Sequence, residues 1–336
     1  MLIVVTGAAG FIGSNIVKEL NRRGHYDIIA VDNLTNGEKC RNLADLDILD
    51  FVDKEDFLQA ILDGDYDNQI DYIFHQGACS ATVEANGRYI MKNNYEYSCI
   101  LLEYAQKNEV PFVYASSAAT YGASKVFIED RENEVPLNAY GYSKMLFDQT
   151  VRRYFDGGLK SPIVGLKYFN VYGHREFHKG RMSSVVLHNF RQYQEHGSVK
   201  LFEGCQGFEN GEQSRDFISI EDVVRVNLHF FDNHTQSPDE ISGIFNCGTG
   251  QARSFNDLAL ATINACRKAE GENTMNLQTA VTQGIIEYTP FPGDLSGKYQ
   301  CFTQANSDRL IKDGHYKTPF LTLEQGVENY VTLLLS

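Results

Sequence analysis

The hydrophobic and polar positions in the first half of the chain form two alternating patterns. Short runs rich in β-branched residues predict buried strands, and longer stretches with apolar residues three or four positions apart predict amphipathic helices. Helical segments fall between the strand runs, as at Phe11–Arg23 and Arg88–Lys107. The strand runs are Leu2–Thr6, Asp27–Val31, Ala44–Ile48, Tyr72–His75, Phe112–Ala115 and Ile163–Lys167. This alternation predicts an α/β fold, a doubly wound parallel sheet with helices on both faces.

After residue 170 the pattern becomes irregular. Loops are expected around residues 203–214, 233–243 and 269–283, and a stretch marked by glycine and proline follows at 290–297. We interpret this half as a smaller C-terminal α/β lobe and place the two domains at residues 1–170 and 171–336. The domains are expected to be interleaved, so that no single cut separates them.

The composition is typical of a globular protein. Of the 336 residues, 43% are hydrophobic and 22% are charged, which is enough apolar material for one large core or two domains. Charges interrupt the apolar stretches well before the roughly 20 residues that a bilayer crossing requires, so no membrane partner is expected. Met1–Thr6 lacks a positively charged segment and leads directly into glycines, which favours a buried strand over a signal peptide.

Cysteine usage and net charge restrict the surroundings of the protein. Seven cysteines are scattered without a C-x-x-C pair, which predicts neither a disulfide framework nor a zinc site. No metal is therefore expected, and a reducing compartment, the cytoplasm, fits best. The formal charge of −14 argues against a nucleic-acid partner, because phosphate backbones need a basic surface. An anionic small ligand would need lysines and arginines gathered in one cleft.

The first predicted strand leads into a glycine-rich turn and then a helix. The turn reads Thr6-Gly7-Ala8-Ala9-Gly10-Phe11-Ile12-Gly13. Gly7 permits a tight turn, Gly10 lets a pyrophosphate approach the backbone, and Gly13 allows the helix to pack closely on the strand. N–H groups at the start of the helix would face the phosphates. The sequence therefore predicts a Rossmann-type, NAD(P)-binding domain at 1–170 and a substrate-binding lobe at 171–336.

An acidic residue at the end of the second predicted strand supports this interpretation. Asp32 lies about twenty positions after the glycines, where a carboxylate accepts hydrogen bonds from the adenosine ribose. Asp32 by itself favours NAD. Asn33, Lys39 and Arg41 follow closely, and a cation there could bind a 2′-phosphate, although Lys39 is equally compatible with a solvated loop lysine.

A serine, a tyrosine and a lysine in the following segments suggest hydride-transfer chemistry. Ser117 ends the fifth predicted strand, and Tyr140 and Lys144 are four residues apart, which places both on one face of a helix. A tyrosine is a poor base at neutral pH unless a nearby positive charge lowers its pKa. Lys144 and a nicotinamide ring would supply that charge, and Ser117 would hold the reacting oxygen of the substrate.

Together these features resemble the extended short-chain dehydrogenase/reductases. Within that family, the narrower likeness is to epimerases that invert C6″ of an ADP-linked heptose for the inner core of lipopolysaccharide. The resemblance implies an isomerase with an ADP-sugar substrate, NADP as cofactor (NAD remaining an alternative) and a homo-oligomeric, pentameric assembly. The segments that carry the likeness are Gln76–Ser80, Asn93–Tyr95, Tyr114–Gly122, Tyr140–Lys144, Tyr168–Gly173, His178–Gly180, Leu201–Gly204, Arg215–Phe217 and Phe245–Gly250.

The resemblance also assigns residues to the two ligands. The positions implied to bind the cofactor are Gly7, Gly10, Phe11, Ile12, Gly13, Asp32, Asn33, Lys39, Lys54, Gln76, Gly77, Ala78, Cys79, Ser80, Asn93, Lys144 and Val171. The positions implied to bind the sugar nucleotide are Ser117, Asn170, Arg181, His188, Phe202, Glu203, Gly204, Cys205, Arg215 and Tyr299. By residue type, Arg215 suits a diphosphate because a guanidinium makes bidentate bonds, but a surface role is equally compatible. His188 and Tyr299 could equally be structural.

The resemblance implies a second acid/base beside Tyr140, namely Lys179. One group on each face of a sugar ketone would allow hydride to leave one face and return to the other. Residue type alone favours a solvated loop lysine, and catalysis would require burial or a cationic neighbour to lower the pKa of Lys179. The chain departs from the family at His174, at Arg181 and in apparent insertions at 205–213 and 269–283, and these differences bear on substrate specificity.

Three other functions fit parts of the pattern. A UDP-sugar 4-epimerase would share Ser117, Tyr140 and Lys144 but not the His178-Lys179-Gly180 segment. A 4,6-dehydratase is disfavoured, since Ala118-Ala119-Thr120 stands where an Asp-Glu pair is expected. A non-catalytic NAD(P)-sensing protein is disfavoured by the presence of the complete serine, tyrosine and lysine set.

Overall fold

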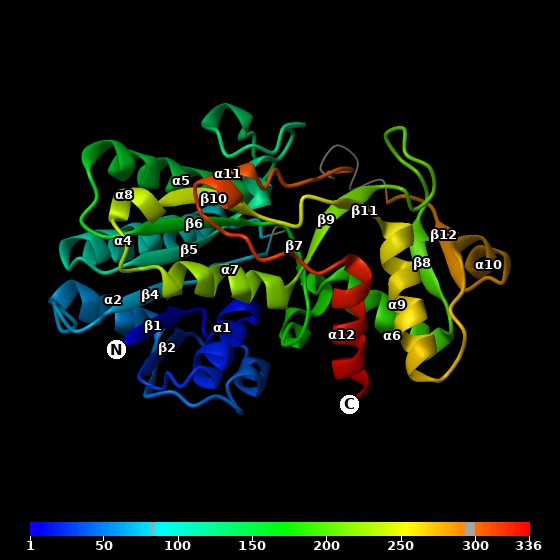
Figure 1. Ribbon diagram of the computed structural model, residues 1–336, viewed down its shortest axis with the longest axis horizontal. Coiled ribbons are helices and arrows are strands. Elements are labelled where there is room, and N and C mark those ends of the chain that lie inside the picture. Colours follow the sequence, from blue (N-terminus) through cyan, green and yellow to red (C-terminus); the bar gives the residue numbers. More distant parts are fainter. Residues whose placement is uncertain (82–83, 293–299) are drawn as a thin grey trace. The chain divides into compact units, whose positions relative to one another are not determined.

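The computed structural model describes residues 1–81, 84–292 and 300–336 (Figure 1). The chain forms two compact units. The first unit contains residues 1–168, 223–247 and 307–317, and the second contains residues 169–222, 248–306 and 318–336. Each unit is thus assembled from separate stretches of sequence. The division into lobes at 1–170 and 171–336 stays a prediction about function.

The first unit is built on a seven-stranded sheet whose neighbouring strands all pair in parallel. The strands lie in the order β10-β6-β5-β4-β1-β2-β3, which reverses between β1 and β4. Ligands of such sheets bind at this reversal, beyond the carboxyl ends of the strands. The expected doubly wound parallel sheet is confirmed. Its strands are β1 (Ile3–Thr6), β2 (Ile28–Asp32), β3 (Asp50–Asp53), β4 (Tyr72–His75), β5 (Phe112–Ser117), β6 (Ile163–Tyr168) and β10 (Gly243–Cys247).

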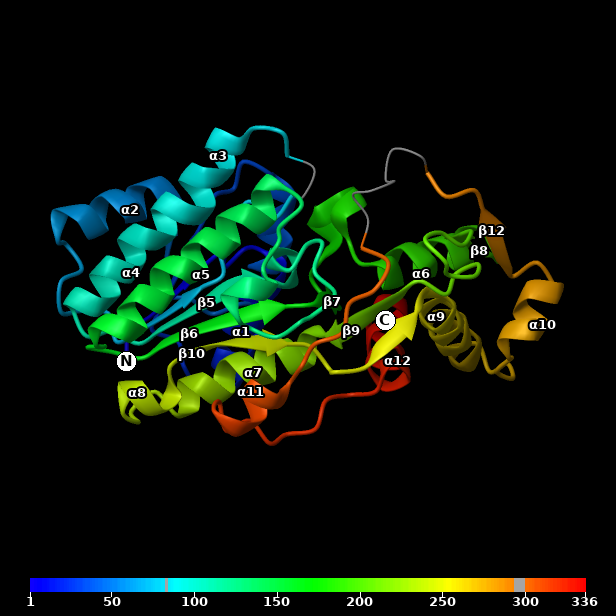
Figure 2. The same ribbon diagram turned by 90° about the horizontal axis from the view of Figure 1, so that it is seen from above.

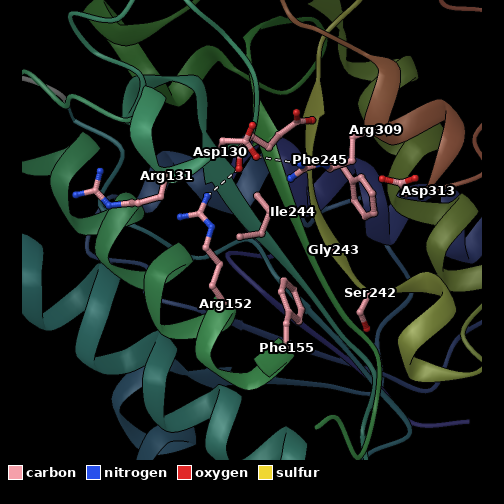
Figure 3. Close-up of a pocket in the computed structure, with 11 residues that line it drawn as sticks. Asp130, Arg131, Arg152, Phe155, Ser242, Gly243, Ile244, Phe245, Arg309 and Asp313 are labelled. Atoms are coloured by element: carbon pink, nitrogen blue, oxygen red, sulfur yellow. Dashed lines mark hydrogen bonds and ion pairs between the residues drawn. The ribbon is translucent and has the colours of Figure 1, made fainter. Parts of the chain in front are cut away.

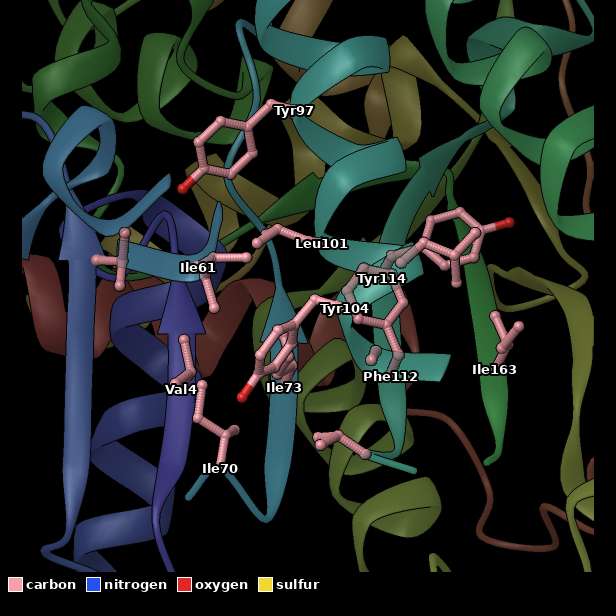
Figure 4. Close-up of a cluster of buried hydrophobic side chains, with 14 of the residues drawn as sticks. Val4, Ile61, Ile70, Ile73, Tyr97, Leu101, Tyr104, Phe112, Tyr114 and Ile163 are labelled. Carbon is pink, nitrogen blue, oxygen red and sulfur yellow. The ribbon is translucent and has the colours of Figure 1, made fainter. Parts of the chain in front are cut away.

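Helices cover both faces of this sheet. Figure 2 shows α2, α4 and α5 on one face and α1 and α7 on the other. Side chains alternate between the faces along β4. Ile73 joins the core beneath α4 and α5 (Figure 4), whereas the Tyr72 and Phe74 rings contact Phe231 of α7, with centroids 4.9 and 5.7 Å away. The helices are α1 (Phe11–Arg22), α2 (Lys54–Asp63), α3 (Gly87–Met91), α4 (Tyr97–Lys107), α5 (Ala139–Gly157), α7 (Ile220–Asp232), α8 (Pro238–Ile241) and α11 (Asp308–Lys312).

The third strand lies later in the chain than the sequence predicts. The expected strand at 44–48 is wrong, because the segment that pairs with β2 is β3, with Val31 opposite Val52. Apolar and polar residues alternate at 44–48, which imitates a strand. The backbone of Asp47 instead exchanges hydrogen bonds with the Asn21 side chain, at 2.7 and 2.9 Å. A side chain therefore satisfies peptide groups that a sheet would otherwise pair.

The helix predicted at 88–107 contains an internal irregularity. Residues 87–91 and 97–107 are α-helical, and Lys92–Glu96 between them forms a π-helical turn. Such turns are rare and occur frequently at functional sites. Asn93, which the resemblance assigns to the cofactor, lies in this turn.

The last strand of the main sheet escaped the sequence analysis. β10 pairs in parallel with β6, although about eighty residues separate them along the chain, with Phe245 opposite Leu166. The predicted loops at 233–243 and 269–283 also contain short helices, α8 and α10. None of the helices in the described ranges is long and apolar enough to span a membrane.

The second unit contains two small sheets and three packed helices. β7 and β9 are parallel, β9 and β11 are antiparallel, and β8 pairs with β12 in parallel. Helices α6, α9 and α12 share a core with Tyr172, Leu258 and Val327. The elements are β7 (Asn170–Tyr172), α6 (Val185–His196), β8 (Val199–Phe202), β9 (Ser214–Ser219), β11 (Ala252–Ser254), α9 (Phe255–Ala269), α10 (Leu277–Thr282), β12 (Ile286–Thr289) and α12 (Leu323–Leu335).

Candidate active site

The glycine turn after β1 is packed too tightly for side chains. Gly7 has φ +68°, and a Cβ there would lie 2.7 Å from the backbone nitrogen of Gly77. A Cβ on Gly13 would lie 2.2 Å from the Gly7 carbonyl oxygen. Phe11 and Ile12 occupy the first turn of α1. The N–H groups in such a turn have no acceptor within the helix and can bind an anion. The geometry fits the diphosphate of a dinucleotide.

Asp32 lies at the carboxyl end of β2 and is almost fully buried. Its carboxylate accepts hydrogen bonds from the Ala9 and Asn33 backbone N–H groups, at 2.9 and 2.7 Å. Lys39 forms an ion pair with the same carboxylate at 2.6 Å and donates to the Asn33 carbonyl at 2.8 Å. The structure therefore brings together the glycine turn, Asp32, Asn33 and Lys39.

The segment after β4 is tied to the neighbouring elements through side-chain amides. Gln76 accepts a hydrogen bond from the Tyr168 hydroxyl at 2.9 Å, and the Gly77 N–H donates to the Thr6 hydroxyl at 3.1 Å. Ala78, Cys79 and Ser80 follow in the same segment. Elsewhere, Lys54 at the start of α2 donates to the Asn93 side chain. These predicted cofactor contacts thus follow the ends of β3 and β4, apart from Asn93 in the π-helical turn.

Asn94 lies in the Asn93–Tyr95 segment that carries the resemblance, but no pattern in the sequence indicated its positioning role. It is fully buried in the π-helical turn, and its amide exchanges hydrogen bonds with the backbone of Cys79 at 2.7 and 3.0 Å. The same amide donates to the Ser143 hydroxyl at 3.1 Å, and Ser143 donates to the Tyr140 carbonyl at 2.7 Å. Asn94 thereby connects the segment after β4 to the helix that carries Tyr140. The rare π turn around it is visible only in the structure.

Ser117 and Tyr140 lie close together and carry the first part of the candidate chemistry. Ser117 ends β5, and Tyr140 lies in the first turn of α5, which Asn138 caps by accepting from the Gly141 N–H at 2.8 Å. Burial raises the pKa of Tyr140, and the hydrogen bond with Ser117 offsets part of that rise. The lowered pKa predicted for Tyr140 depends on Lys144 together with a nicotinamide ring, and it stays a prediction.

Lys144 lies one helical turn after Tyr140, and its ammonium is buried. It donates to the Ala115 carbonyl in β5 at 2.8 Å. Burial lowers the pKa of Lys144 from 10.5 to about 8, while the negative charge of Asp148 acts in the opposite direction. Asp148 is itself fully buried on the next turn of α5. Lys144 is therefore held at the end of β5, where its charge faces little water.

Asp148 belongs to a buried network of charges behind Lys144. Its carboxylate accepts hydrogen bonds from Tyr114 at 2.8 Å, Ser116 at 2.7 Å and Lys167 at 2.6 Å. Lys167, in turn, forms an ion pair with Glu134 at 2.8 Å. Lys167, Glu134 and Asp148 are fully buried, and each charge has a partner of opposite sign. The network joins α5 to β5 and β6 and so fixes the helix that carries Tyr140 and Lys144.

Lys179 lies in the second unit, on a turn of 3₁₀-helix at Phe177–Met182. Burial lowers the pKa of Lys179, against the opposing charge of Glu176. The fully buried Glu176 carboxylate accepts from the Ser184 hydroxyl at 2.6 Å and the Gly173 N–H at 3.3 Å, which anchors the turn. The direction of this shift is the one that a lysine base requires, and the catalytic role of Lys179 stays a prediction.

The remaining predicted substrate residues of the second unit fall on several elements. Arg181 is exposed, and its carbonyl contacts the His188 ring nitrogen at 3.4 Å. Asn170 and Val171 begin β7. Phe202 ends β8 and leads into Glu203, Gly204 and Cys205. Tyr299 lies outside the described residues.

Arg215 is placed by its neighbour Asp216. The buried Asp216 carboxylate accepts from the Thr249, Gly250 and Ala305 backbone N–H groups at 2.7, 2.9 and 3.0 Å. These bonds hold β9 against the segments on either side of it. The Arg215 guanidinium lies over the Phe255 ring, 5.9 Å from its centroid, and the residue is 6% exposed. A buried arginine on a fixed strand can offer bidentate bonds to a phosphate.

A cavity of about 440 Å³ in the first unit has none of the predicted site residues in its lining (Figure 3). Two of its arginines are paired with carboxylates, Arg309 with Asp130 at 3.0 Å and Arg152 with Glu134 at 2.8 Å. In the part of the chain that the structure describes, no group of three or more His, Cys, Asp or Glu side chains could hold a metal ion.

Known proteins identify the family to which this architecture and these residues belong. Residues 3–248 match the model of the NAD dependent epimerase/dehydratase family. That span includes the glycine turn, Ser117, Tyr140 and Lys144. The chain belongs to this family.

Individual relatives extend the similarity to nearly the full length. The chain is 54% identical over 332 residues to the ADP-L-glycero-D-manno-heptose-6-epimerase of Thiobacillus denitrificans, covering 99% of this chain and 98% of the relative. A solved structure of the Helicobacter pylori enzyme of the same name is similar with a TM-score of 0.79 at 31% identity, covering 100% and 96% of the two chains. A UDP-glucose 4-epimerase from Thermotoga maritima is similar with a TM-score of 0.77 at 26% identity, covering 100% and 99%.

Proposed function

We propose that this protein converts ADP-D-glycero-D-manno-heptose to ADP-L-glycero-D-manno-heptose by inverting the configuration at C6″. One observation carries the proposal: the 54% identity to the Thiobacillus denitrificans enzyme extends over 99% of the chain and so includes both units. Most of the predicted substrate positions lie in the second unit, so identity confined to the first unit would not support this substrate. The product would supply heptose for the inner core of lipopolysaccharide.

The residues of the first unit support proton transfer at one face of the sugar. A bound nicotinamide would accept a hydride from C6″ and return it. Ser117 and Tyr140 would hold the C6″ oxygen between their hydroxyls, and Tyr140 would remove the proton from that oxygen. Lys144, buried and donating to Ala115, would keep a positive charge near the site and favour the phenolate.

Lys179 would act as the second acid/base after the ketone has turned its other face. Its lowered pKa supports this role, because an amine can remove a proton at neutral pH only if its ammonium form is disfavoured. Arg215 and the Phe202–Cys205 segment would bind the ADP group, with Asn170, Arg181 and His188 nearer the sugar. The proton handlers would thereby serve opposite faces of one carbon.

Three finer features complete the proposal. NADP is the proposed cofactor: Lys39, held by Asp32 at 2.6 Å, supports binding of a 2′-phosphate.

A homo-oligomer, a pentamer by resemblance to related epimerases, is the proposed assembly, and light scattering of the purified protein tests it. The cytoplasm is the proposed location, supported by seven cysteines whose described positions contain no disulfide.

The decisive experiment uses ADP-D-glycero-D-manno-heptose and purified protein without added cofactor. NMR should show conversion to the L-glycero epimer with no net change in nicotinamide absorbance. If the reaction is run in D₂O, the C6″ hydrogen should remain protium, because the proposed hydride is removed and returned without exchange. Turnover of UDP-glucose with inert ADP-heptose would contradict the substrate. Deuterium at C6″ would contradict the returned hydride.

A further inference from the structure

Two cysteines far apart in sequence lie side by side in the second unit. The Cys205 and Cys301 sulfur atoms are 3.4 Å apart. Cys205 begins the segment that leads from β8 to β9, and Cys301 precedes a stretch that runs beside the start of β9. Cys205 is half-buried, whereas Cys301 is 7% exposed. An oxidant from solvent would therefore reach Cys205 first.

The backbone holds both sulfur atoms against the start of β9. The Ser214 N–H donates to the Cys301 carbonyl at 2.9 Å, and the Thr303 N–H donates to the Ser214 carbonyl at 3.2 Å. On the other side, the Gln213 amide donates to the Glu203 carbonyl at 2.9 Å and contacts the Cys205 sulfur at 3.5 Å. The proximity of the sulfurs thus comes from ordered pairing on both sides of β9.

We propose that Cys205 and Cys301 form a reversible oxidation site, at which a peroxide joins them in a disulfide and weakens binding of the nucleotide. The expected effect on nucleotide binding rests on the proposed function, because Phe202–Cys205 and Arg215 are the predicted contacts of the ADP group. Burial raises the pKa of the Cys301 thiol to about 11, and the positive charge of Arg215 opposes this rise.

The chemistry balances with hydrogen peroxide as the oxidant. The Cys205 thiolate attacks one peroxide oxygen, the O–O bond breaks, and Cys205 becomes a sulfenic acid while one water leaves. The Cys301 sulfur then displaces the sulfenic oxygen, which leaves as a second water with the Cys301 proton. Two thiols have lost two electrons and two protons, and one peroxide has become two waters. A dithiol reductant reverses the change by thiol exchange.

Disulfide formation would shift the nucleotide segment. A disulfide requires the sulfurs to approach to about 2.05 Å, so a separation of 3.4 Å must shorten by more than an ångström. A misplacement of about 1 Å in an active site can cost about 10²-fold in rate, and we expect a smaller, about tenfold effect of this shift on the affinity for ADP. The first unit, which binds the cofactor, would not be altered.

The test compares the full-length protein with Cys205→Ser, Cys301→Ala and Cys40→Ser, the last removing an exposed cysteine as a matched control. After peroxide treatment and alkylation, mass spectrometry of the unsubstituted protein and of Cys40→Ser should show a peptide pair joined at 205 and 301, released by dithiothreitol. Calorimetry should show about tenfold weaker ADP binding in the oxidised protein, with recovery on reduction. ADP binding by Cys205→Ser should not respond to peroxide.

Each other result has a defined meaning. Absence of the 205–301 peptide pair, or another cysteine pair forming first, would overturn the oxidation site. A 205–301 disulfide with unchanged ADP affinity would overturn its effect on the nucleotide. If neither the reduced nor the oxidised protein binds ADP, the proposed substrate and the effect on the nucleotide both fail. The peptide pair would still decide whether the two cysteines react.

Discussion

The two units support their predicted site residues in different ways. In the first unit, Tyr140 and Lys144 lie on α5, a helix of nineteen residues that a buried charge network joins to β5 and β6. In the second unit, Lys179 lies on a six-residue 3₁₀ turn that the buried Glu176 carboxylate anchors. The predicted nucleotide contacts at 202–205 lie at the end of a four-residue strand.

The predicted proton-transfer residues of the first unit are thus held more rigidly than the predicted substrate contacts of the second unit. Proton transfer requires hydroxyl and ammonium groups within fractions of an ångström of their productive positions, which long elements with buried partners provide. Recognition of one sugar nucleotide among many can change through loops without disturbing that geometry. The similar solved structures include epimerases of ADP-linked and of UDP-linked sugars. The departures that the resemblance leads us to expect, at Arg181 and in residues 205–213, lie in the second unit.

Removing the Tyr140 hydroxyl should have the largest effect on activity. Tyr140→Phe should lower kcat by about 10²–10⁴-fold, because the phenyl ring cannot take the proton. The variant should bind NADP and unfold as the unsubstituted protein does. Tyr142→Phe, which alters an exposed ring two residues away, is the matched control and should retain full activity. Equal losses in the two variants would mean that α5 is disturbed as a whole.

Breaking the charge network should destabilise the first unit. Asp148→Asn leaves the buried Lys167 ammonium with one carboxylate fewer, and the free energy of unfolding should fall by about 3–5 kcal/mol. Asp308→Asn removes a carboxylate from an exposed ion pair with Lys312 and should cost less than about 1 kcal/mol. Denaturant titration of both variants measures the difference. Similar costs at the two sites would contradict the rigid support assigned to α5.

The pH dependence of stability should reveal the buried ammonium of Lys144. The pKa of Lys144 is about 8 in the folded protein, against 10.5 for an unperturbed lysine such as that of the unfolded chain. Below pH 8 the ammonium is charged in both states, and its burial lowers the stability of the folded protein. This cost disappears as the pH rises toward 10.5. The difference in unfolding free energy between Lys144→Met and the unsubstituted protein should therefore change by about 3 kcal/mol between pH 7 and 10.5. Lys160→Met, at an exposed position, should show no such change. A constant difference for Lys144→Met would mean that the ammonium is solvated.

Substitution of Lys179 should reduce activity without a comparable loss of stability. Lys179→Ala should lower kcat by about 10²-fold. Lys179→Arg keeps the charge but cannot release a proton at neutral pH, and it should be equally impaired. Lys200→Ala, at an exposed position on β8, serves as the control. Activity restored by arginine would mean that Lys179 contributes charge alone.

The smallest predicted effect concerns the choice of cofactor. Lys39→Ala should weaken NADP binding by about tenfold through loss of a charge-assisted contact, with a smaller change for NAD. Fluorescence titration of the protein, freed of any bound dinucleotide, with each cofactor measures the ratio. An equal loss for both would show that Lys39 acts through its ion pair with Asp32.

Local sequence patterns were sufficient for much of the first unit. The β1 turn and helix, the positions of β4 and β6 and the spacing of Tyr140 and Lys144 depend on residues within one or two turns of each other. The same local information misplaced the third strand at 44–48. Apolar and polar residues alternate there as in a strand, but the Asn21 side chain makes the hydrogen bonds of the Asp47 backbone. The roles of individual site residues, Lys179 above all, stay predictions that the variants above test.

Periodicity and the glycine turn by themselves predicted the fold class and a dinucleotide-binding unit, and the four-residue spacing of Tyr140 and Lys144 placed both on one helix. Tertiary structure decided that β10 joins β6, that Asn94 connects the segment after β4 to α5, and that Asp148 and Lys167 become a buried pair. It also brought Cys205 to Cys301. The physical reason is that hydrogen bonds and ion pairs between distant residues depend on packing, which strips water from some polar groups and leaves others solvated.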